Sequence, residues 1–140
     1  MTTPAEIVTQ ARSWLGVRWL HQGRTAGGLD CIGLVLKVAH ALNLTEFDTR
    51  DYARFASDET MLELCRSHLV VVQPADLAPG DLAVFGFDSQ RHIGIIGDYP
   101  APGALSLIHA HAINRQVVEH RLDDQWQRRI LGRFRFPGVT

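Results

Sequence analysis

The sequence is poor in cysteine, in net charge and in long hydrophobic runs. Its two cysteines, Cys31 and Cys65, allow at most one disulfide, which excludes a fold built on a disulfide framework. Fourteen basic residues against fifteen acidic ones leave a formal net charge of −1, which argues against a nucleic-acid partner because such partners select a basic face. No apolar run reaches about 18 residues, and we therefore expect no membrane insertion.

Signals of processing and of internal division are also lacking. Met1 to Pro4 lead directly into an amphipathic pattern, without a basic leader, an apolar run and a cleavage site, so we expect no signal peptide. No repeat, low-complexity tract or Gly/Ser-rich linker divides the chain. With 46% hydrophobic and 21% charged residues, the sequence predicts a single globular domain over residues 1–140.

The first half of the sequence predicts helices. A Thr-Pro pair at residues 3–4 is typical of a helix start, and apolar residues follow at helical spacing up to Leu15. Residues 31–42 are apolar almost all round, which predicts a buried helix. A third, more exposed helix is expected over about residues 58–68. Residues 17–29 contain glycines that mark turns, and they predict a loop.

The second half has the shorter apolar runs and turn signals of strands. Because no helical pattern separates these runs, antiparallel pairing is expected. Helices first and strands second indicate an α+β domain, with N-terminal helices packed on a C-terminal antiparallel sheet. The expected strands are residues 82–85, 92–96, 105–111, 117–122 and 130–136.

Cys31 stands directly after Asp30, the expected N-cap of the second helix. A thiol in the first turn lies among unpaired backbone N–H groups and at the positive end of the helix dipole, and both stabilise the nucleophilic thiolate. The alternative is a cysteine that only happens to follow a helix cap. Cys65 lies on the apolar stripe of the third helix and is interpreted as a buried hydrophobic residue.

A nucleophilic thiol needs a base and a group that orients the base. His92 opens a strand, and Gly94 on the same face leaves room for a second backbone or a substrate. His109 and His111 share one face of the next strand, so one of them is expected beside His92 in a Cys–His–His arrangement. His120 lies between two charged residues and is interpreted as solvent-exposed.

Cysteine and histidine in this number also allow a zinc site as the competing interpretation. The short Cys-x-x-Cys and His-x-x-x-His spacings typical of zinc sites are absent from the sequence. We therefore expect no metal and no cofactor.

Four short motifs occur in order along the chain: DCIGLV at 30–35, LAPGDLAVF at 77–85, HIGI at 92–95 and IHA at 108–110. Together they resemble the motifs of the NlpC/P60 cysteine peptidases, papain-like enzymes that cut the stem peptides of the cell wall. The resemblance implies a papain-like fold with Cys31 as nucleophile, His92 as base and His109 as the orienting residue. His111 is kept as the alternative to His109. The resemblance also implies peptidoglycan as substrate, with the bond between D-glutamate and the diamino acid as the expected target.

Two positions depart from the family pattern. Trp19 stands where the family usually has a tyrosine that lines the site, and Ile32 stands where many members have a serine. Both positions would flank the substrate, and we expect Trp19 and His111 to contact it. Asp30 has two open roles, as the helix N-cap and as the partner of a free amine on the peptide.

Residues 15–34 and 117–137 look like a narrower branch, the short single-domain members carried by tailed phages and gene transfer agents. Members of that branch sit at the tail tip and open the cell wall for DNA delivery. The resemblance implies tail-tip or hub proteins as partners. It also implies a location in a virion or phage-like particle, made in the cytoplasm and acting on the cell wall or periplasm.

Two other functions are compatible with the same residues. The domain can be a structural tail-tip protein whose peptidase site is unused or closed by a neighbour. It can also be a papain-like amidase or acyltransferase that uses the same thiolate on an amide or a lipid.

Overall fold

The computed structural model describes residues 1–53, 59–88 and 90–140. Its helices are α1 (Pro4–Arg12), α2 (Cys31–Ala41), α3 (Thr60–His68) and α4 (Asp124–Gln127), with a 3-10 turn η1 (Pro74–Asp76). A short strand pair is formed by β1 (Arg24–Thr25) and β2 (Gly28–Leu29). The main sheet contains β3 (Val70–Val71), β4 (Leu82–Phe87), β5 (Gln90–Gly97), β6 (Ser106–His111), β7 (Gln116–Arg121) and β8 (Ile130–Arg135).

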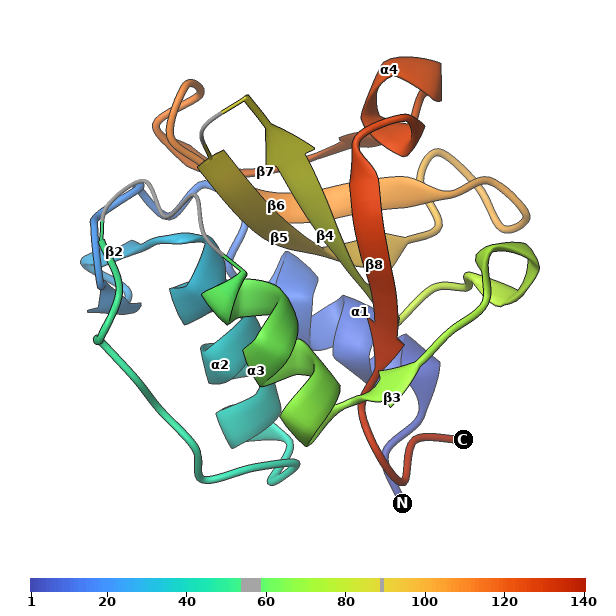
Figure 1. The fold of residues 1–140 in the computed structure, drawn as a ribbon, viewed down its shortest axis with the longest axis horizontal. Coiled ribbons are helices and arrows are strands. Elements are labelled where there is room, and N and C mark those ends of the chain that lie inside the picture. The colour runs from blue at the N-terminus through green and yellow to red at the C-terminus, as the bar shows by residue number, and fades with distance from the viewer. Residues whose placement is uncertain (54–58, 89) are drawn as a thin grey trace.

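The main sheet is antiparallel throughout, as the sequence predicts, and its strand order is β3-β8-β4-β5-β6-β7. Figure 1 shows α1, α2 and α3 gathered on one face of this sheet, with α4 away from them. The expected α+β class is therefore confirmed. The last strand does not extend the row beyond β7. It returns to lie between β3 and β4, so only β4 to β7 form a simple meander.

Alternation along the strands divides the apolar side chains between the two faces of the sheet. On the helix face, Val84 and Ile95 join the main core together with α1, α2 and α3. On the opposite face, Ile96 belongs to a smaller cluster against which Trp126 of α4 packs. The period of two places His92 on the same face of β5 as Ile96. The histidine therefore points to the side of the sheet that Trp126 covers.

The structure corrects the predicted boundaries in the first third of the chain. The first helix ends at Arg12 instead of continuing to Leu15. A turn then carries the chain to Gly16, whose φ of +86° favours glycine. Residues 17–29, which the sequence predicts as a loop, contain the β1–β2 pair.

Two other elements, β3 and α4, are not predicted by the sequence pattern. They have two and four residues, which is too short for hydrophobic periodicity to reveal them. The predicted third helix is present from Thr60, while its expected first residue, at position 58, lies outside the described residues. None of the described helices is long and apolar enough to cross a membrane.

An ion pair between a buried carboxylate and a partly exposed arginine holds the start of β4 to the end of β8. Asp81 is 2% exposed and accepts two hydrogen bonds from Arg135, at 2.6 Å from Nε and 2.8 Å from Nη2. The same carboxylate accepts from the backbone N–H of Ala78 at 2.9 Å, which closes the predicted turn. Gly80 in this turn has a φ of +92°, and an added Cβ would lie 2.9 Å from Cα of Pro4. The turn at Gly80 therefore packs directly against Pro4, the first residue of α1.

We expect Arg135→Ala to lower the free energy of unfolding by about 1–3 kcal/mol, because it leaves the buried Asp81 carboxylate without its charged partner. Arg133→Ala is the matched control, since Arg133 lies two residues earlier on β8 and pairs with no carboxylate among the residues that the structure describes. Urea unfolding followed by circular dichroism measures both variants. Equal losses of stability in the two would contradict this role of the ion pair.

Candidate active site

The start of α2 and parts of β5, β6 and α4 surround a cavity of about 840 Å³. Cys31 and His92 both line it, so the thiol and the imidazole that the sequence pairs share one space. The residues expected to contact substrate line it as well. These are Trp19, Asp30 and His111.

Cys31 is the first residue of α2, and Asp30 is the N-cap of this helix, as predicted. The Asp30 carboxylate accepts a hydrogen bond of 2.8 Å from the backbone N–H of Gly33, which fixes the first helical turn. Gly33 has no room for a side chain, because an added Cβ would lie 2.2 Å from the carbonyl oxygen of Gly23. The loop before the helix therefore packs directly against the turn that carries the thiol.

The resting form of Cys31 differs from the expected thiolate. Loss of hydration raises the pKa of the thiol to about 12, and the Asp30 carboxylate adds to this rise. Backbone N–H groups of Ile93, Ile32 and Cys31 itself lower the pKa by a smaller amount. Desolvation and one full negative charge outweigh the partial charges of the helix start. A thiolate therefore forms only when a neighbouring base takes the proton.

His92 and His109 are hydrogen-bonded to each other, whereas the strand spacing predicts only that His109 or His111 lies beside His92. Nε2 of His92 lies 2.6 Å from Nδ1 of His109, whose side chain has no exposed surface. Gly94 permits this approach, because an added Cβ would lie 2.5 Å from Leu107 and 3.1 Å from Cβ of His109. The hydrogen bond occupies Nε2 of His92 and leaves Nδ1 as the nitrogen available to a thiol.

His111 occupies a different position from His109. It lines the cavity, and its Nδ1 is hydrogen-bonded to Oδ1 of Asn114. Its ring centroid lies 6.0 Å from that of His92, compared with 4.8 Å for His109. The geometry therefore pairs His109 with His92 and leaves His111 at the wall of the cavity.

His120 is not the solvent-exposed residue that the sequence predicts. It is partly buried, and its Nε2 lies 2.8 Å from Nε2 of His109. Trp126 packs against both rings, with centroid distances of 5.0 Å to His109 and 5.1 Å to His120. The prediction is wrong because charged neighbours along the sequence say nothing about a partner on the adjacent strand.

Burial keeps the paired histidines neutral. Loss of hydration lowers the pKa of His92 to about 3, with smaller contributions from the neighbouring rings of His111 and His120. Loss of hydration also lowers the pKa of His109, and the ring of His92 adds to this effect. Unfolding returns both rings to water, where the pKa of a histidine is about 6.5.

We therefore expect stability to fall as the pH drops below about 6.5. The unfolded chain then binds protons at His92 and His109 while the folded chain does not, so each residue contributes a loss of up to about 1.4 kcal/mol per pH unit. This stabilisation is complete above the unfolded pKa and is lost as the pH falls toward the lowered folded values. Urea unfolding between about pH 7 and pH 5 measures the slope.

The matched variants for this slope are His109→Gln and His68→Gln. The first removes one buried ring and should flatten the pH dependence, whereas the second removes an exposed histidine of α3 and should leave it unchanged. Identical slopes in the two variants would contradict the assignment of the effect to the buried pair.

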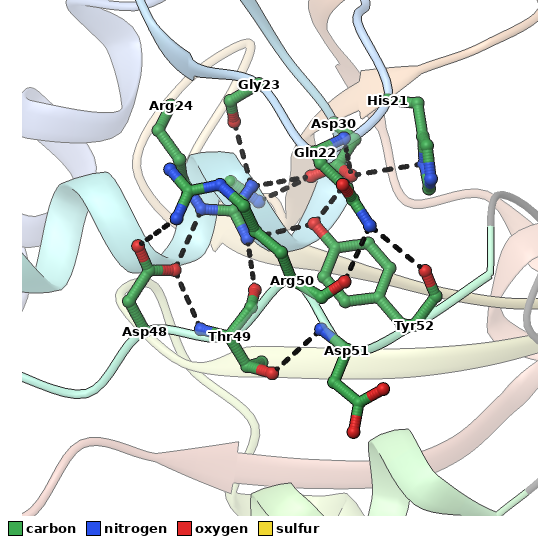
Figure 2. Close-up of polar contacts among 11 residues, drawn as sticks. His21, Gln22, Gly23, Arg24, Asp30, Asp48, Thr49, Arg50, Asp51 and Tyr52 are labelled. Carbon is green, nitrogen blue, oxygen red and sulfur yellow. Dashed lines mark hydrogen bonds and ion pairs between the residues drawn. The ribbon is translucent and has the colours of Figure 1, made fainter.

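A buried arginine, Arg24, gathers polar groups around itself and Asp30 (Figure 2), and Asp30 lines the cavity. Arg24 is 8% exposed and uses all five of its N–H groups as donors, as a buried guanidinium requires. The acceptors are Oδ1 of Asp48 at 3.0 Å, the carbonyl of Gly23 at 2.9 Å, Oδ1 of Asp30 at 3.3 Å, the carbonyl of Thr49 at 2.7 Å and the hydroxyl of Tyr52 at 2.9 Å.

The two carboxylate oxygens of Asp30 are fully used as well. Besides Gly33 and Arg24, they accept from the backbone N–H of Gln22 at 2.7 Å and from the hydroxyl of Tyr52 at 2.8 Å. Four donors fill the roughly four lone-pair positions of a carboxylate. The capping role of Asp30 is therefore confirmed. Its role toward a substrate amine stays a prediction, and such an amine would have to displace one of these donors.

Tyr52 and Trp126 line the cavity, although no pattern in the sequence singles them out. Tyr52 reaches the site from an irregular segment that Arg24 holds in place, and Trp126 comes from the four-residue helix α4. Neither lies in a motif or a periodic element. Only the folded chain reveals them, because both reach the site through contacts between distant parts of the sequence.

We expect Arg24→Lys to lower the free energy of unfolding by about 1–3 kcal/mol, because an ammonium group cannot serve five acceptors in a planar fork. Arg50→Lys is the control, since the side chain of Arg50 is 55% exposed and pairs only with Asp48 among the described carboxylates. Thermal and urea unfolding compare the two variants. A loss in Arg24→Lys no larger than that in Arg50→Lys would contradict the organising role of Arg24.

His92, His109 and His120 are hydrogen-bonded to one another. Among residues 1–53, 59–88 and 90–140, no group of three histidine, cysteine or carboxylate side chains is placed to hold a metal ion. The competing zinc interpretation thus finds no ligand set in this part of the chain.

Known structures with the same architecture decide the fold family. An NlpC/P60 family protein from Bacillus cereus superposes with a TM-score of 0.69 at 21% identity, over 96% of this chain and 40% of that one. The NlpC/p60 domain of the peptidoglycan hydrolase SagA gives a TM-score of 0.63 at 21% identity, over 95% of this chain and 98% of that domain. The chain has the NlpC/P60 fold.

This NlpC/P60 fold is also similar to the peptidoglycan hydrolase RipB from Mycobacterium tuberculosis, with a TM-score of 0.62 at 18% identity over 95% of this chain and 64% of RipB. The chain thus spans less than half of the Bacillus cereus protein but nearly the whole SagA domain. No family model matches the sequence, and no curated protein matches it. The fold expected from the four motifs is confirmed by these structures.

Proposed function

We propose that this chain is a cysteine endopeptidase that cleaves the stem peptides of peptidoglycan. One observation carries the proposal: α2 and β5 bring Cys31 and His92 to the same cavity, with His109 hydrogen-bonded to His92. Two proteins that superpose on the chain, SagA and RipB, are peptidoglycan hydrolases, and they support the choice of substrate.

The proposed reaction begins with attack of the Cys31 sulfur on the carbonyl carbon of a peptide bond. Nδ1 of His92 takes the thiol proton as the new bond forms, while His109 holds the ring through Nε2. The backbone N–H of Cys31, at the start of α2, donates to the oxygen that becomes negative. The proton then passes from His92 to the leaving amine, and water hydrolyses the acyl-enzyme.

The cavity lining suits a peptide that carries carboxylates. Arg91, Arg128 and Arg129 line it, and guanidinium groups bind carboxylates through paired hydrogen bonds. A stem peptide supplies such a group on D-glutamate. We therefore propose the bond between D-glutamate and the diamino acid as the preferred target. The side chains proposed to contact the peptide are Trp19, Asp30 and His111.

The proposal extends to the setting of the enzyme, and this part rests on sequence likeness alone. Residues 15–34 and 117–137 resemble the branch carried by tailed phages and gene transfer agents. We propose a place at the tail tip of such a particle, with tail-tip or hub proteins as partners. The protein would be made in the cytoplasm and would act on the cell wall or periplasm.

Digestion of purified peptidoglycan tests the activity. Wild type and Cys65→Ala, which alters only a buried cysteine of α3, are expected to release stem-peptide fragments. Cys31→Ala should remain folded by circular dichroism and lose activity by at least about a thousandfold, because the nucleophile is gone. Mass spectrometry of the fragments identifies the bond that is cut.

Each outcome separates the possible functions. Fragment release by Cys31→Ala would remove Cys31 from the mechanism. No release by wild type, together with an unreactive Cys31, would favour a structural tail-tip protein with a closed site. No release together with rapid alkylation of Cys31 would favour an amidase or acyltransferase with a different substrate.

A further inference from the structure

Three histidine rings and one backbone carbonyl form an unbroken chain of hydrogen bonds across β5, β6 and β7. Nε2 of His92 lies 2.6 Å from Nδ1 of His109. Nε2 of His109 lies 2.8 Å from Nε2 of His120. Nδ1 of His120 lies 2.8 Å from the carbonyl oxygen of Arg121. This chain of hydrogen bonds therefore begins at the cavity, with His92, and ends on the backbone of β7, at Arg121.

The carbonyl of Arg121 determines where each proton of this chain lies. A carbonyl oxygen only accepts, so Nδ1 of His120 carries a proton and, in a neutral ring, Nε2 of His120 is bare. Nε2 of His109 must then donate to His120, which leaves Nδ1 of His109 bare. By the same rule Nε2 of His92 donates to His109. Nδ1 of His92 is thus the bare nitrogen at the end of the chain.

We propose that His120 is a positioning residue that acts through His109 and sets the tautomer of His92. The bare Nε2 of His120 accepts a hydrogen bond from Nε2 of His109 and so keeps the His109 proton on that nitrogen. Nδ1 of His109 then accepts from Nε2 of His92, which leaves a lone pair on Nδ1 of His92. The assignment of the tautomers follows from hydrogen-bond geometry. Only the statement that this lone pair accepts the Cys31 proton rests on the proposed function.

The surroundings keep His92 and His109 neutral, as the chain of hydrogen bonds requires. His109 has no exposed surface, and Trp126 packs on all three rings at centroid distances of 6.2 Å, 5.0 Å and 5.1 Å for His92, His109 and His120. Burial lowers the pKa of His92 to about 3 and also lowers that of His109. With these tautomers, an extra proton on His109 would place two N–H groups against each other in its contact with His92. An extra proton on His120 would do the same in its contact with His109.

The chain of hydrogen bonds also determines where the proton goes when the Cys31 thiol ionises. The S–H bond of Cys31 breaks, its electron pair stays on sulfur, and the proton adds to Nδ1 of His92. Nε2 of His92 still donates to His109, so no second proton has to move. With the opposite tautomer, an N–H group of His92 would face the thiol and no base would be available.

Nuclear magnetic resonance of the histidine rings tests the tautomers without any substrate. In wild type labelled with isotopic histidine, proton–nitrogen correlations at neutral pH are expected to show a protonated Nε2 and a bare Nδ1 on His92 and His109. His120 should show the reverse. This measurement needs no variant. A protonated Nδ1 on His92 would overturn the proposal.

Two substitutions of His120 test its influence on the thiol, in a Cys65→Ala background so that only Cys31 reacts. His120→Leu removes the acceptor of the His109 Nε2–H group. We therefore expect His92 to shift to the opposite tautomer. We also expect the alkylation rate at neutral pH to fall about tenfold, which is the effect of leaving one buried donor without an acceptor. His120→Gln supplies an amide oxygen and should restore both the tautomer and the rate. His68→Leu controls for the loss of an exposed histidine. Wild-type tautomer and rate in folded His120→Leu would overturn the proposal.

These readouts separate the positioning role from the proposed function. If the tautomers and alkylation rates are as expected but peptidoglycan is not digested, the proposed function fails and the role of His120 stands. If peptidoglycan is digested but the tautomers are reversed, the role of His120 fails and the proposed function stands.

Discussion

The carboxylate of Asp30 is the group on which the rest of the site depends. A buried carboxylate is strongly unfavourable unless donors surround it, and here four donors from three parts of the chain do so. The hydrogen bonds to the Asp30 carboxylate bring the 22–24 loop, the first turn of α2 and Tyr52 together. The cap that begins α2 is also what positions Cys31, so the position of the proposed nucleophile follows from the solvation of one neighbouring charge.

The same charge disfavours the thiolate form of Cys31. Loss of hydration and the neighbouring Asp30 carboxylate both raise the pKa of the Cys31 thiol, so a thiolate forms there only if a base takes the proton. The face of the sheet away from the main helices carries His92, the proposed base. His92 and His109 lie there beside Trp126, in surroundings dry enough to keep both rings neutral.

Features that follow from local rules could be predicted from the sequence. The Asp30 cap, the thiol after it and the placement of His109 and His111 on one strand face depend only on neighbours and on periodicity. The preference for His109 over His111 follows from the family resemblance, whereas the partner of His109 on β7 depends on the register between strands. Such contacts leave no mark along the chain, which is why the roles of His120 and Trp126 could not be predicted.

The five hydrogen bonds of Arg24 have a mechanical consequence. The same guanidinium holds the segment that carries Tyr52 at the cavity wall and the carboxylate that caps α2. The position of Tyr52 at the cavity wall and the position of the Cys31 sulfur are therefore coupled. An outward motion of residues 48–52 would remove the Tyr52 donor from Asp30 and loosen the first turn of α2, so a change at this wall also changes the surroundings of Cys31.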